Sequence, residues 1–449
     1  MSHLIKPILD GTYPKVSYGK GVFLYDEHGK DYLDASSGAV TVSVGHGVQE
    51  ITDVLENQAK RVSFVYRSQF TSEAAERLAE KIYKLSNGHL SYSFFVNSGT
   101  EATETAMKMA LQHFQEKGQG SKLKILSRWM SYHGITIGSL SMSGHSIRRT
   151  RFVPLLQDYP TVSAPYCYRC PYHMEFPSCQ LRCADELERA IIRIGEEHIA
   201  AFIAEPIIGA AGAAITPPPG YYERIRDICD RYNILFIADE VMTGLGRTGK
   251  MFGYDHWEAK PDIVTLGKGL GAGYTPIAAA VATEEVMLPI KKGSKLVMSG
   301  HTFSANPLSC ATALSVLQYV EKHNLVNESA RKGAYLKKEL LKLKERFSII
   351  GDVRGEGLLL GVEFVEDKKT KYPFPTSAQL TNQIIQIAMQ NGLLLYPSAA
   401  GIEGVRGDAV IISPPFTIKE GEIKELLRRF EKTLLSIEKR LKNNQEERE

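Results

Sequence analysis

The 449-residue sequence has no uninterrupted apolar run near the roughly 18 residues that a membrane-spanning helix needs. It contains only six cysteines, which do not form a disulfide framework in a chain of this length. Neither sign of charge dominates, because 54 Lys and Arg residues stand against 51 Asp and Glu residues. These features argue against a membrane protein and a dedicated nucleic-acid binder. The first residues also lack the apolar core of a signal peptide, so we expect a cytoplasmic protein.

The composition that is present is typical of a globular enzyme. Hydrophobic residues make up 43% and charged residues 23% of the sequence, and the length predicts two or three domains. Short apolar runs alternate with helical patterns, which predicts βαβ units and a parallel sheet buried on both faces. The predicted strands lie at residues 92–96, 122–127, 198–208, 233–241, 262–266 and 277–282.

After Arg331 the sequence favours a second, smaller domain. Its Lys/Glu/Leu-rich helices and the short apolar strand at 357–366 are typical of an α+β unit. We therefore expect an α/β protein with a large domain over residues 66–330. The small domain is expected to combine residues 1–65 with residues 331–449.

A glycine-rich loop directly follows one of the predicted strands. Gly244 to Lys250 reads GLGRTGK, which fits both the dinucleotide-binding pattern and the start of a P-loop. The match is incomplete, because Met251 stands where a P-loop needs Ser or Thr. Asp239 and Glu240, just upstream, would also repel a phosphate. A nucleotide-binding protein that uses this loop is therefore an alternative hypothesis, and a purely structural loop is favoured.

The helix predicted after residue 97 begins with a pattern that can bind phosphate. Ser98 stands three residues before Glu101, which is the spacing of a capping box. The free N–H groups and the positive dipole end of such a helix, near Gly99 and Thr100, can hold a phosphate at the carboxyl edge of a sheet. The pattern also occurs in ordinary capped helices, so alone it does not establish a binding site.

Lys268 lies between glycines at the end of the predicted strand at 262–266. Burial lowers the pKa of a lysine and makes its amine a competent Schiff-base nucleophile. Asp239 ends another buried strand, where its carboxylate needs a partner such as a pyridinium nitrogen. Together with a helix N-terminus for a phosphate, the two residues predict a site for pyridoxal 5′-phosphate.

A set of longer motifs spans nearly the whole chain. They are NSGTEATETAMKMA at 97–110, YHG at 132–134, AEPI at 204–207, IADEV at 237–241, GRTGKMF at 246–252, TLGKGLGAGYTPIAA at 265–279 and HTFSANPLSCA at 301–311. In these motifs the chain resembles the class III aminotransferases, a branch of the fold-type-I pyridoxal-phosphate enzymes. The resemblance implies a large domain with a mostly parallel seven-stranded sheet between helices, and a smaller α+β domain. Family members carry the same glycine loop without binding nucleotides there.

The resemblance implies catalytic and ring-binding roles for five residues. Lys268 would bind the aldehyde of pyridoxal phosphate and move the proton of the substrate. Asp239 would keep the ring nitrogen protonated, so that the ring can accept electrons. Tyr132 and Val241 would pack on the two faces of the ring, and Glu205 would lie close to it.

Phosphate binding is implied for a second group of residues. Ser98, Gly99 and Thr100 would hold the phosphate, together with Thr302 of the partner subunit. The enzyme is therefore expected to be a homodimer or a tetramer with active sites at the subunit interface. His133 also belongs to the cofactor site in this interpretation, although a structural role is equally compatible with its motif.

The predicted reaction is the transfer of an amino group from an ω-amino acid or amine to a 2-oxo acid, with pyruvate expected, in a ping-pong cycle. Arg406 is the candidate ligand for a substrate carboxylate, and Val40 and Tyr66 are candidate pocket walls. Arg406 directly precedes Gly407, whereas relatives usually have Arg-x-x-Gly, so a surface arginine stays an open alternative. Another alternative is adenosylmethionine-8-amino-7-oxononanoate (diaminopelargonate) aminotransferase of biotin synthesis. No nucleic acid or membrane partner is expected.

Four cysteines lie within a short segment that the predicted chemistry does not need. Cys167, Cys170, Cys179 and Cys183, with His173 between them, could ligate zinc. The central interval is short for a zinc ribbon, and reduced thiols are the usual state of cysteines in such a protein. We therefore predict no metal.

Overall fold

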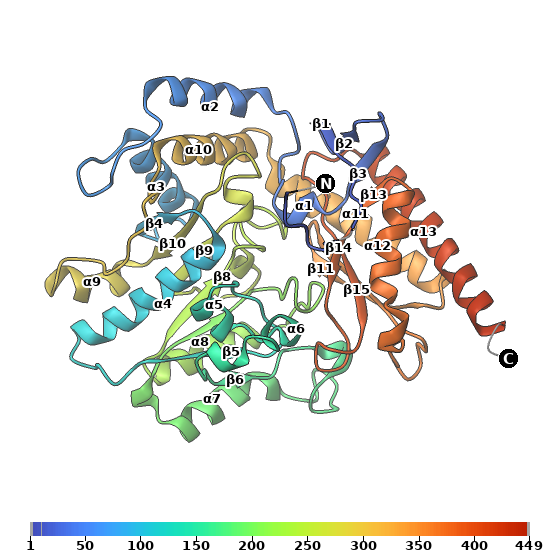
Figure 1. Cartoon of the computed structure of the whole chain (residues 1–449). Coiled ribbons are helices and arrows are strands. Elements are labelled where there is room, and N and C mark those ends of the chain that lie inside the picture. Colours follow the sequence, from blue (N-terminus) through green and yellow to red (C-terminus); the bar gives the residue numbers. More distant parts are fainter. Residues whose placement is uncertain (1–2, 10, 447–449) are drawn as a thin grey trace.

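The largest sheet has seven strands in the order β4-β10-β9-β8-β7-β5-β6 (Figure 1). The computed structural model describes residues 3–9 and 11–446. Strands β9, β8, β7, β5 and β6 run parallel, whereas β10 is antiparallel to both β9 and β4. This confirms the predicted mostly parallel sheet. The strands are β4 (Tyr92–Val96), β5 (Lys124–Arg128), β6 (Thr161–Val162), β7 (Ile199–Ala204), β8 (Leu235–Asp239), β9 (Ile263–Leu266) and β10 (Ala278–Ala282).

Helices cover both faces of this sheet, because alternate side chains of each strand point to opposite faces. In β10, Ala279 and Val281 belong to one apolar cluster, and the alternating residues Ala278, Ala280 and Ala282 belong to the other. The first face packs on α3 (Glu73–Leu85), α7 (Arg182–Ile194), α8 (Tyr221–Arg231) and α10 (Pro307–Lys322). The second face packs on α4 (Gly99–Glu116), α5 (Ile137–Met142) and α9 (Glu284–Lys292). The central strands β7, β8, β9 and β10 are thus buried on both sides, as their continuous apolar character predicts.

A smaller part of the molecule is built from two four-stranded sheets, β11-β12-β15-β14 and β1-β2-β3-β13. The strands are β1 (Val16–Lys20), β2 (Phe23–Asp26), β3 (Asp31–Asp34), β11 (Ile350–Glu356), β12 (Leu359–Phe364), β13 (Leu393–Leu394), β14 (Tyr396–Ser398) and β15 (Asp408–Ile412). Three long helices pack on them: α11 (Leu325–Arg346), α12 (Leu380–Gln390) and α13 (Glu420–Glu446).

The two ends of the chain meet in this smaller part. Strand β3 pairs in parallel with β13, and Leu33 lies opposite Leu393. Figure 1 shows the N-terminal strands in blue beside the C-terminal elements in red. The predicted boundary at residue 330 lies inside α11, and the boundary at residue 65 lies between α2 (Gln49–Arg61) and α3. The exact division into domains stays a prediction.

The glycine-rich loop fastens the two parts to each other. Arg247 is 2% exposed and donates hydrogen bonds to the carbonyl oxygens of Leu358 (3.0 Å) and Pro414 (2.7 Å). Its guanidinium group also lies 4.5 Å from the centre of the Phe416 ring. Residues 244–248 are all buried. The loop is therefore filled by protein contacts, which supports the structural interpretation and not the alternative of a nucleotide site.

The remaining helices are short. They are α1 (Ser37–Val40), whose backbone is kinked at Gly38 and Ala39, and α6 (Ser146–Arg149). Across residues 3–9 and 11–446, no helix is both long and apolar enough to cross a membrane.

Substituting a helical glycine by alanine tests the close packing between α11 and the turn before β12. A Cβ atom on Gly333 would lie 2.0 Å from the carbonyl oxygen of Gly357, whereas a Cβ on Gly421 in α13 would meet nothing within 4 Å. Alanine normally favours a helix over glycine. We expect Gly333→Ala to destabilise the protein by about 2 kcal/mol, lowering Tm by about 2 °C. Gly421→Ala, the control, should leave Tm unchanged or raise it; equal Tm values for the two variants would contradict this packing.

Candidate active site

A cavity of about 360 Å³ brings together most of the residues predicted for cofactor binding. It lies at the carboxyl edge of the large sheet, where β8 ends at Asp239 and Lys268 follows β9. Ligands of open α/β sheets commonly bind at this edge. The predicted residues that line it are Ser98, Gly99, Thr100, Tyr132, His133, Glu205, Asp239, Val241 and Lys268.

Lys268 presents its amine at the floor of the cavity. Its Nζ atom donates a hydrogen bond to the carbonyl oxygen of Ala39, at 2.8 Å. Burial of the side chain lowers the pKa of the Lys268 ammonium to about 8. An ordinary lysine is almost fully protonated near neutral pH. Lys268, by contrast, has a substantial neutral fraction just above neutral pH, and the neutral amine is the nucleophilic form.

Asp239 is fixed in place by three hydrogen bonds. One carboxylate oxygen accepts from Nδ1 of His133 at 2.7 Å. The other accepts from the backbone N–H of Val241 (3.1 Å) and the hydroxyl of Thr265 (3.0 Å). His133 is 2% exposed, and its Nε2 atom has no hydrogen-bond partner among the described residues. Protein contacts alone thus orient the Asp239 carboxylate. The Nε2 atom of His133 is left available for a further hydrogen bond.

The start of α4, where the sequence predicts a phosphate site, lines the cavity. The Ser98 hydroxyl accepts from the N–H of Glu101 at 3.4 Å, as the capping box predicts. However, the Glu101 carboxylate accepts from the N–H of Asn97 (2.7 Å), one residue before the position expected in a capping box. The first N–H groups of a helix have no acceptor within the helix, and those of Gly99 and its neighbour lie beside the cavity.

Gly99, at the helix start, leaves little room for a side chain beside Val241. A Cβ atom on Gly99 would lie 3.0 Å from a methyl group of Val241, and one on Gly267 would lie 3.2 Å from the same methyl group. The valine therefore packs between two backbone segments that carry no side chain. This arrangement keeps one wall of the cavity flat, as an aromatic ring would need.

The loop that carries Tyr132 is held against the helix start and against β7. The Thr100 hydroxyl accepts from the N–H groups of Ile135 and Thr136, both at 3.3 Å. The Glu205 carboxylate accepts from the N–H of Tyr132 (3.0 Å) and from another backbone N–H at 2.9 Å. Burial raises the pKa of the Glu205 carboxyl group above its ordinary value. The loop is therefore positioned by two anchors, one at each side of the cavity.

The residues predicted from the resemblance to bind substrate lie elsewhere in this chain. Val40 is buried in an apolar cluster between the two parts of the molecule, and its neighbour Ala39 lines the cavity instead. Tyr66 and Arg406 are exposed, as is Thr302, the residue predicted to reach the partner subunit. The structure does not bring these residues to the cavity, and their predicted roles stay predictions.

Sequence reasoning missed several residues that line the cavity. The most polar are Arg148 on α6 and Tyr396 at the start of β14. Arg148 lies in the segment SGHSIRR, which carries no motif signal of its own. Tyr396 comes from the smaller part of the molecule, so no local pattern connects it with the sheet edge. The other missed lining residues are Ala39, Gly134, Ile135, Ala210 and Met242.

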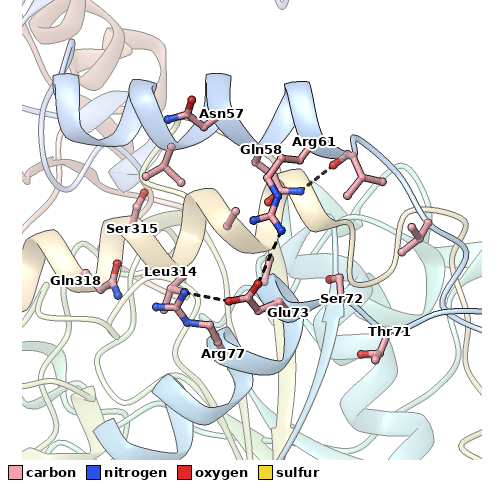
Figure 2. Close-up of a pocket in the computed structure, with 15 residues that line it drawn as sticks. Asn57, Gln58, Arg61, Thr71, Ser72, Glu73, Arg77, Leu314, Ser315 and Gln318 are labelled. Carbon is pink, nitrogen blue, oxygen red and sulfur yellow. Dashed lines mark hydrogen bonds and ion pairs between the residues drawn. The ribbon is translucent and has the colours of Figure 1, made fainter.

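A second cavity, of about 400 Å³, lies between α2, α3 and α10 (Figure 2). Figure 2 shows Glu73 between two arginines, Arg61 at 4.0 Å and Arg77 at 3.6 Å. The lining therefore holds two positive charges and one negative charge, and none of the predicted cofactor residues lines this cavity.

The cysteine-bearing segment lines a third cavity, of about 590 Å³, which includes Cys167, Cys170 and His173. All six cysteines are free thiols. In the part of the chain that the structure describes, no group of three or more His, Cys, Asp and Glu residues could hold a metal ion.

The family model for class III aminotransferases matches residues 10–434 of the chain. The chain belongs to this family. It is 56% identical to the uncharacterized aminotransferase YodT of Bacillus subtilis, over 99% of this chain and 100% of YodT. It is 36% identical to a taurine–pyruvate aminotransferase of Bilophila wadsworthia (94% and 92% covered). The identity is also 36% to an adenosylmethionine-8-amino-7-oxononanoate aminotransferase of Methanocaldococcus jannaschii (91% and 89% covered).

Solved transaminase structures have the same fold over nearly the whole chain. An (S)-enantioselective ω-transaminase of Thermomicrobium roseum superimposes with a TM-score of 0.90 at 35% identity, covering 97% of this chain and 96% of that one. A pyridoxal-phosphate-bound amine transaminase of an uncultivated Pseudomonas species gives 0.91 at 31% identity, covering 97% and 99%. These structures confirm the predicted fold-type-I architecture.

The protein is a transferase that uses pyridoxal 5′-phosphate, and the cavity suits this cofactor. The wall beside Val241 suits the flat ring of the cofactor, and the start of α4 suits its phosphate. The oriented carboxylate of Asp239 suits the nitrogen of the cofactor ring. When bound, the cofactor supplies an aldehyde that reacts with amines and a ring that accepts electrons. The protein contributes the positioning of these groups and an amine that can carry a proton.

Replacing Lys268 by alanine tests whether its amine attaches the cofactor. We expect Lys268→Ala to lose the covalent attachment, because the Lys268 amine is the predicted nucleophile and lines the cavity. After treatment with borohydride, the intact mass of the wild-type protein should rise by one reduced cofactor, and that of the variant should not. Lys250→Ala, which removes an exposed lysine of the glycine loop, should behave like the wild type. A labelled Lys268→Ala protein, or an unlabelled Lys250→Ala protein, would show that another lysine carries the cofactor.

Proposed function

We propose that this enzyme transfers an amino group from an ω-amino acid or amine to a 2-oxo acid, with pyruvate as the acceptor, in a ping-pong cycle. The observation that carries the proposal is the meeting of Lys268, Asp239 and the start of α4 in one cavity. The 36% identity with a taurine–pyruvate aminotransferase supports this choice of donor and acceptor. The cytoplasmic location expected from the sequence remains part of the proposal.

The geometry suggests how the protein's own residues divide the work. Asp239 would hold a proton on a ring nitrogen, since its position is fixed by His133, Val241 and Thr265. Lys268 would take a proton from the amino-bearing carbon of the donor and deliver it to the C4′ carbon of the cofactor. Its lowered pKa, about 8, lets the same amine both accept and release a proton near neutral pH.

A second candidate is adenosylmethionine-8-amino-7-oxononanoate aminotransferase. It is supported by the 36% identity with the enzyme of Methanocaldococcus jannaschii that has this activity in its name. The cavity residues discussed above serve either reaction, so the two candidates differ in their substrates and not in their cofactor site.

The two candidates are separated by half-reactions of the purified holoenzyme. We expect β-alanine, taurine or 1-phenylethylamine to bleach the visible absorption band of the bound cofactor, and pyruvate to restore it with formation of alanine. The reason is that each half-reaction moves the amino group onto or off the enzyme. Bleaching by S-adenosylmethionine alone, with recovery by 8-amino-7-oxononanoate, would favour the second candidate. An absorption band that no donor bleaches would contradict both.

We also propose that the active form is a homodimer or a tetramer, with Thr302 completing the phosphate site of the neighbouring subunit. Thr302 is exposed and lies away from the cavity of its own chain. Large apolar side chains around it are also exposed, including Met298 (65%) and Phe303 (57%). Exposed apolar groups in one segment are typical of a surface that another chain covers.

A shared phosphate site predicts that dissociation removes cofactor and activity together. On dilution of the holoenzyme, the sedimentation coefficient, the bound cofactor and the specific activity should fall over the same concentration range. Thr302→Ala should weaken cofactor binding about tenfold, because a hydrogen bond to a charged phosphate is lost. A monomer with full activity would contradict the proposal.

A further inference from the structure

Arg148 places a positive charge in the active-site cavity that the cofactor-binding residues do not account for. It belongs to α6, which follows the loop of Tyr132, and its side chain lines the same cavity as Lys268. Its guanidinium group lies 4.3 Å from the centre of the Tyr132 ring. The Tyr132 hydroxyl also interacts with Arg148. A guanidinium has five N–H donors, so one that contacts a tyrosine still has donors for a planar anion.

No carboxylate of the described residues forms an ion pair with this charge. Among the described residues, Arg148 takes part in no ion pair. The two carboxylates that line the cavity, those of Glu205 and Asp239, already accept hydrogen bonds from backbone and side-chain groups of the cavity wall. The positive charge of Arg148 also acts on Lys268, where it adds to the effect of burial in lowering the pKa of the ammonium.

The neighbouring arginine, Arg149, has a different environment from Arg148. Arg149 points its guanidinium at the carbonyl oxygens of Leu140, Ser141 and Ser143, at 3.0, 3.0 and 2.6 Å. Those contacts close the turn after α5, which is a structural task. Arg148 makes no such contacts with carbonyl groups of the described chain and faces the cavity instead.

We propose that Arg148 binds the acidic group of the substrates, a carboxylate or a sulfonate. This inference rests on the proposed transaminase function and names the substrate class: amines and 2-oxo acids that carry a planar or tetrahedral anion within reach of the reacting carbon. The phosphate of the cofactor has a separate site at the start of α4. The assignment gives Arg148 the role that the resemblance suggests for Arg406, which is exposed and away from the cavity.

The test compares Arg148→Gln with the wild-type holoenzyme in binding and in half-reactions. The binding probe is propionate, a carboxylate that has neither an amine nor a keto group, titrated by its effect on the visible absorption band. We expect the Kd of propionate and the KM values of pyruvate, β-alanine and taurine to rise about 10- to 100-fold, since a charge-assisted hydrogen bond is lost. The bleaching rate with 1-phenylethylamine, which has no acidic group, should change less than about twofold.

Three further variants make the outcome specific. Arg151→Gln removes an exposed arginine of the same segment and should leave all these values unchanged. Arg148→Lys keeps the charge but loses the planar fork, so it should fall between the wild type and Arg148→Gln. Arg406→Gln tests the competing residue: a selective loss of acid binding in this variant, and not in Arg148→Gln, would overturn the proposal.

Two other results would also overturn the assignment of Arg148, and both can be told apart from a failure of the proposed transaminase function. Loss of bound pyridoxal phosphate in Arg148→Gln would show that Arg148 supports the cofactor. An equal loss for 1-phenylethylamine and for the acids would show a structural role. If the wild type bleached with no donor, the proposed function would be wrong, but the Kd of propionate in the variants would still decide whether Arg148 binds acids.

Discussion

The active-site cavity depends on the contact between the large sheet and the smaller part of the molecule. Arg247 makes this contact from a buried loop. It donates hydrogen bonds to the carbonyl groups of Leu358, just before β12, and of Pro414, just after β15. The cavity needs it, because Ala39 and Tyr396 come from segments that pack with the smaller part, while Lys268 comes from the large sheet. A buried guanidinium with defined acceptors holds such a contact in one geometry.

Within the cavity, the charges are arranged in two groups. The acidic groups, Asp239 and Glu205, are held by donors from the protein, which fixes where each can act. The basic groups, Lys268 and Arg148, are engaged only weakly, by one carbonyl oxygen and one aromatic ring. Fixed acids and available bases suit an enzyme whose ligands are themselves anionic, because the ligands complete the charge balance when they bind.

Sequence patterns predicted the parts of the structure that depend on local character. Long apolar runs identified six strands of the large sheet, but β6 has only two residues, Thr161 and Val162, and offers no run to detect. Most of the residues predicted to bind the cofactor line one cavity because their motifs lie at strand ends. Ala39 was missed in favour of Val40 because the backbone there has left-handed conformations, so no periodicity tells which side chain faces the cavity. Arg148 reaches the cavity through a tertiary contact that no spacing records.

The pairing of β3 with β13 cannot form until most of the chain has been synthesised. Lys30, just before β3, also hydrogen-bonds to the carbonyl of Gln390, a separation of 360 residues. At a synthesis rate of about 5–20 residues per second, the N-terminal strands wait about 20–70 s before their partner leaves the ribosome. During that time β3 has an unpaired edge, so the nascent protein must rely on its first three strands alone, or on a chaperone, to avoid pairing with other chains.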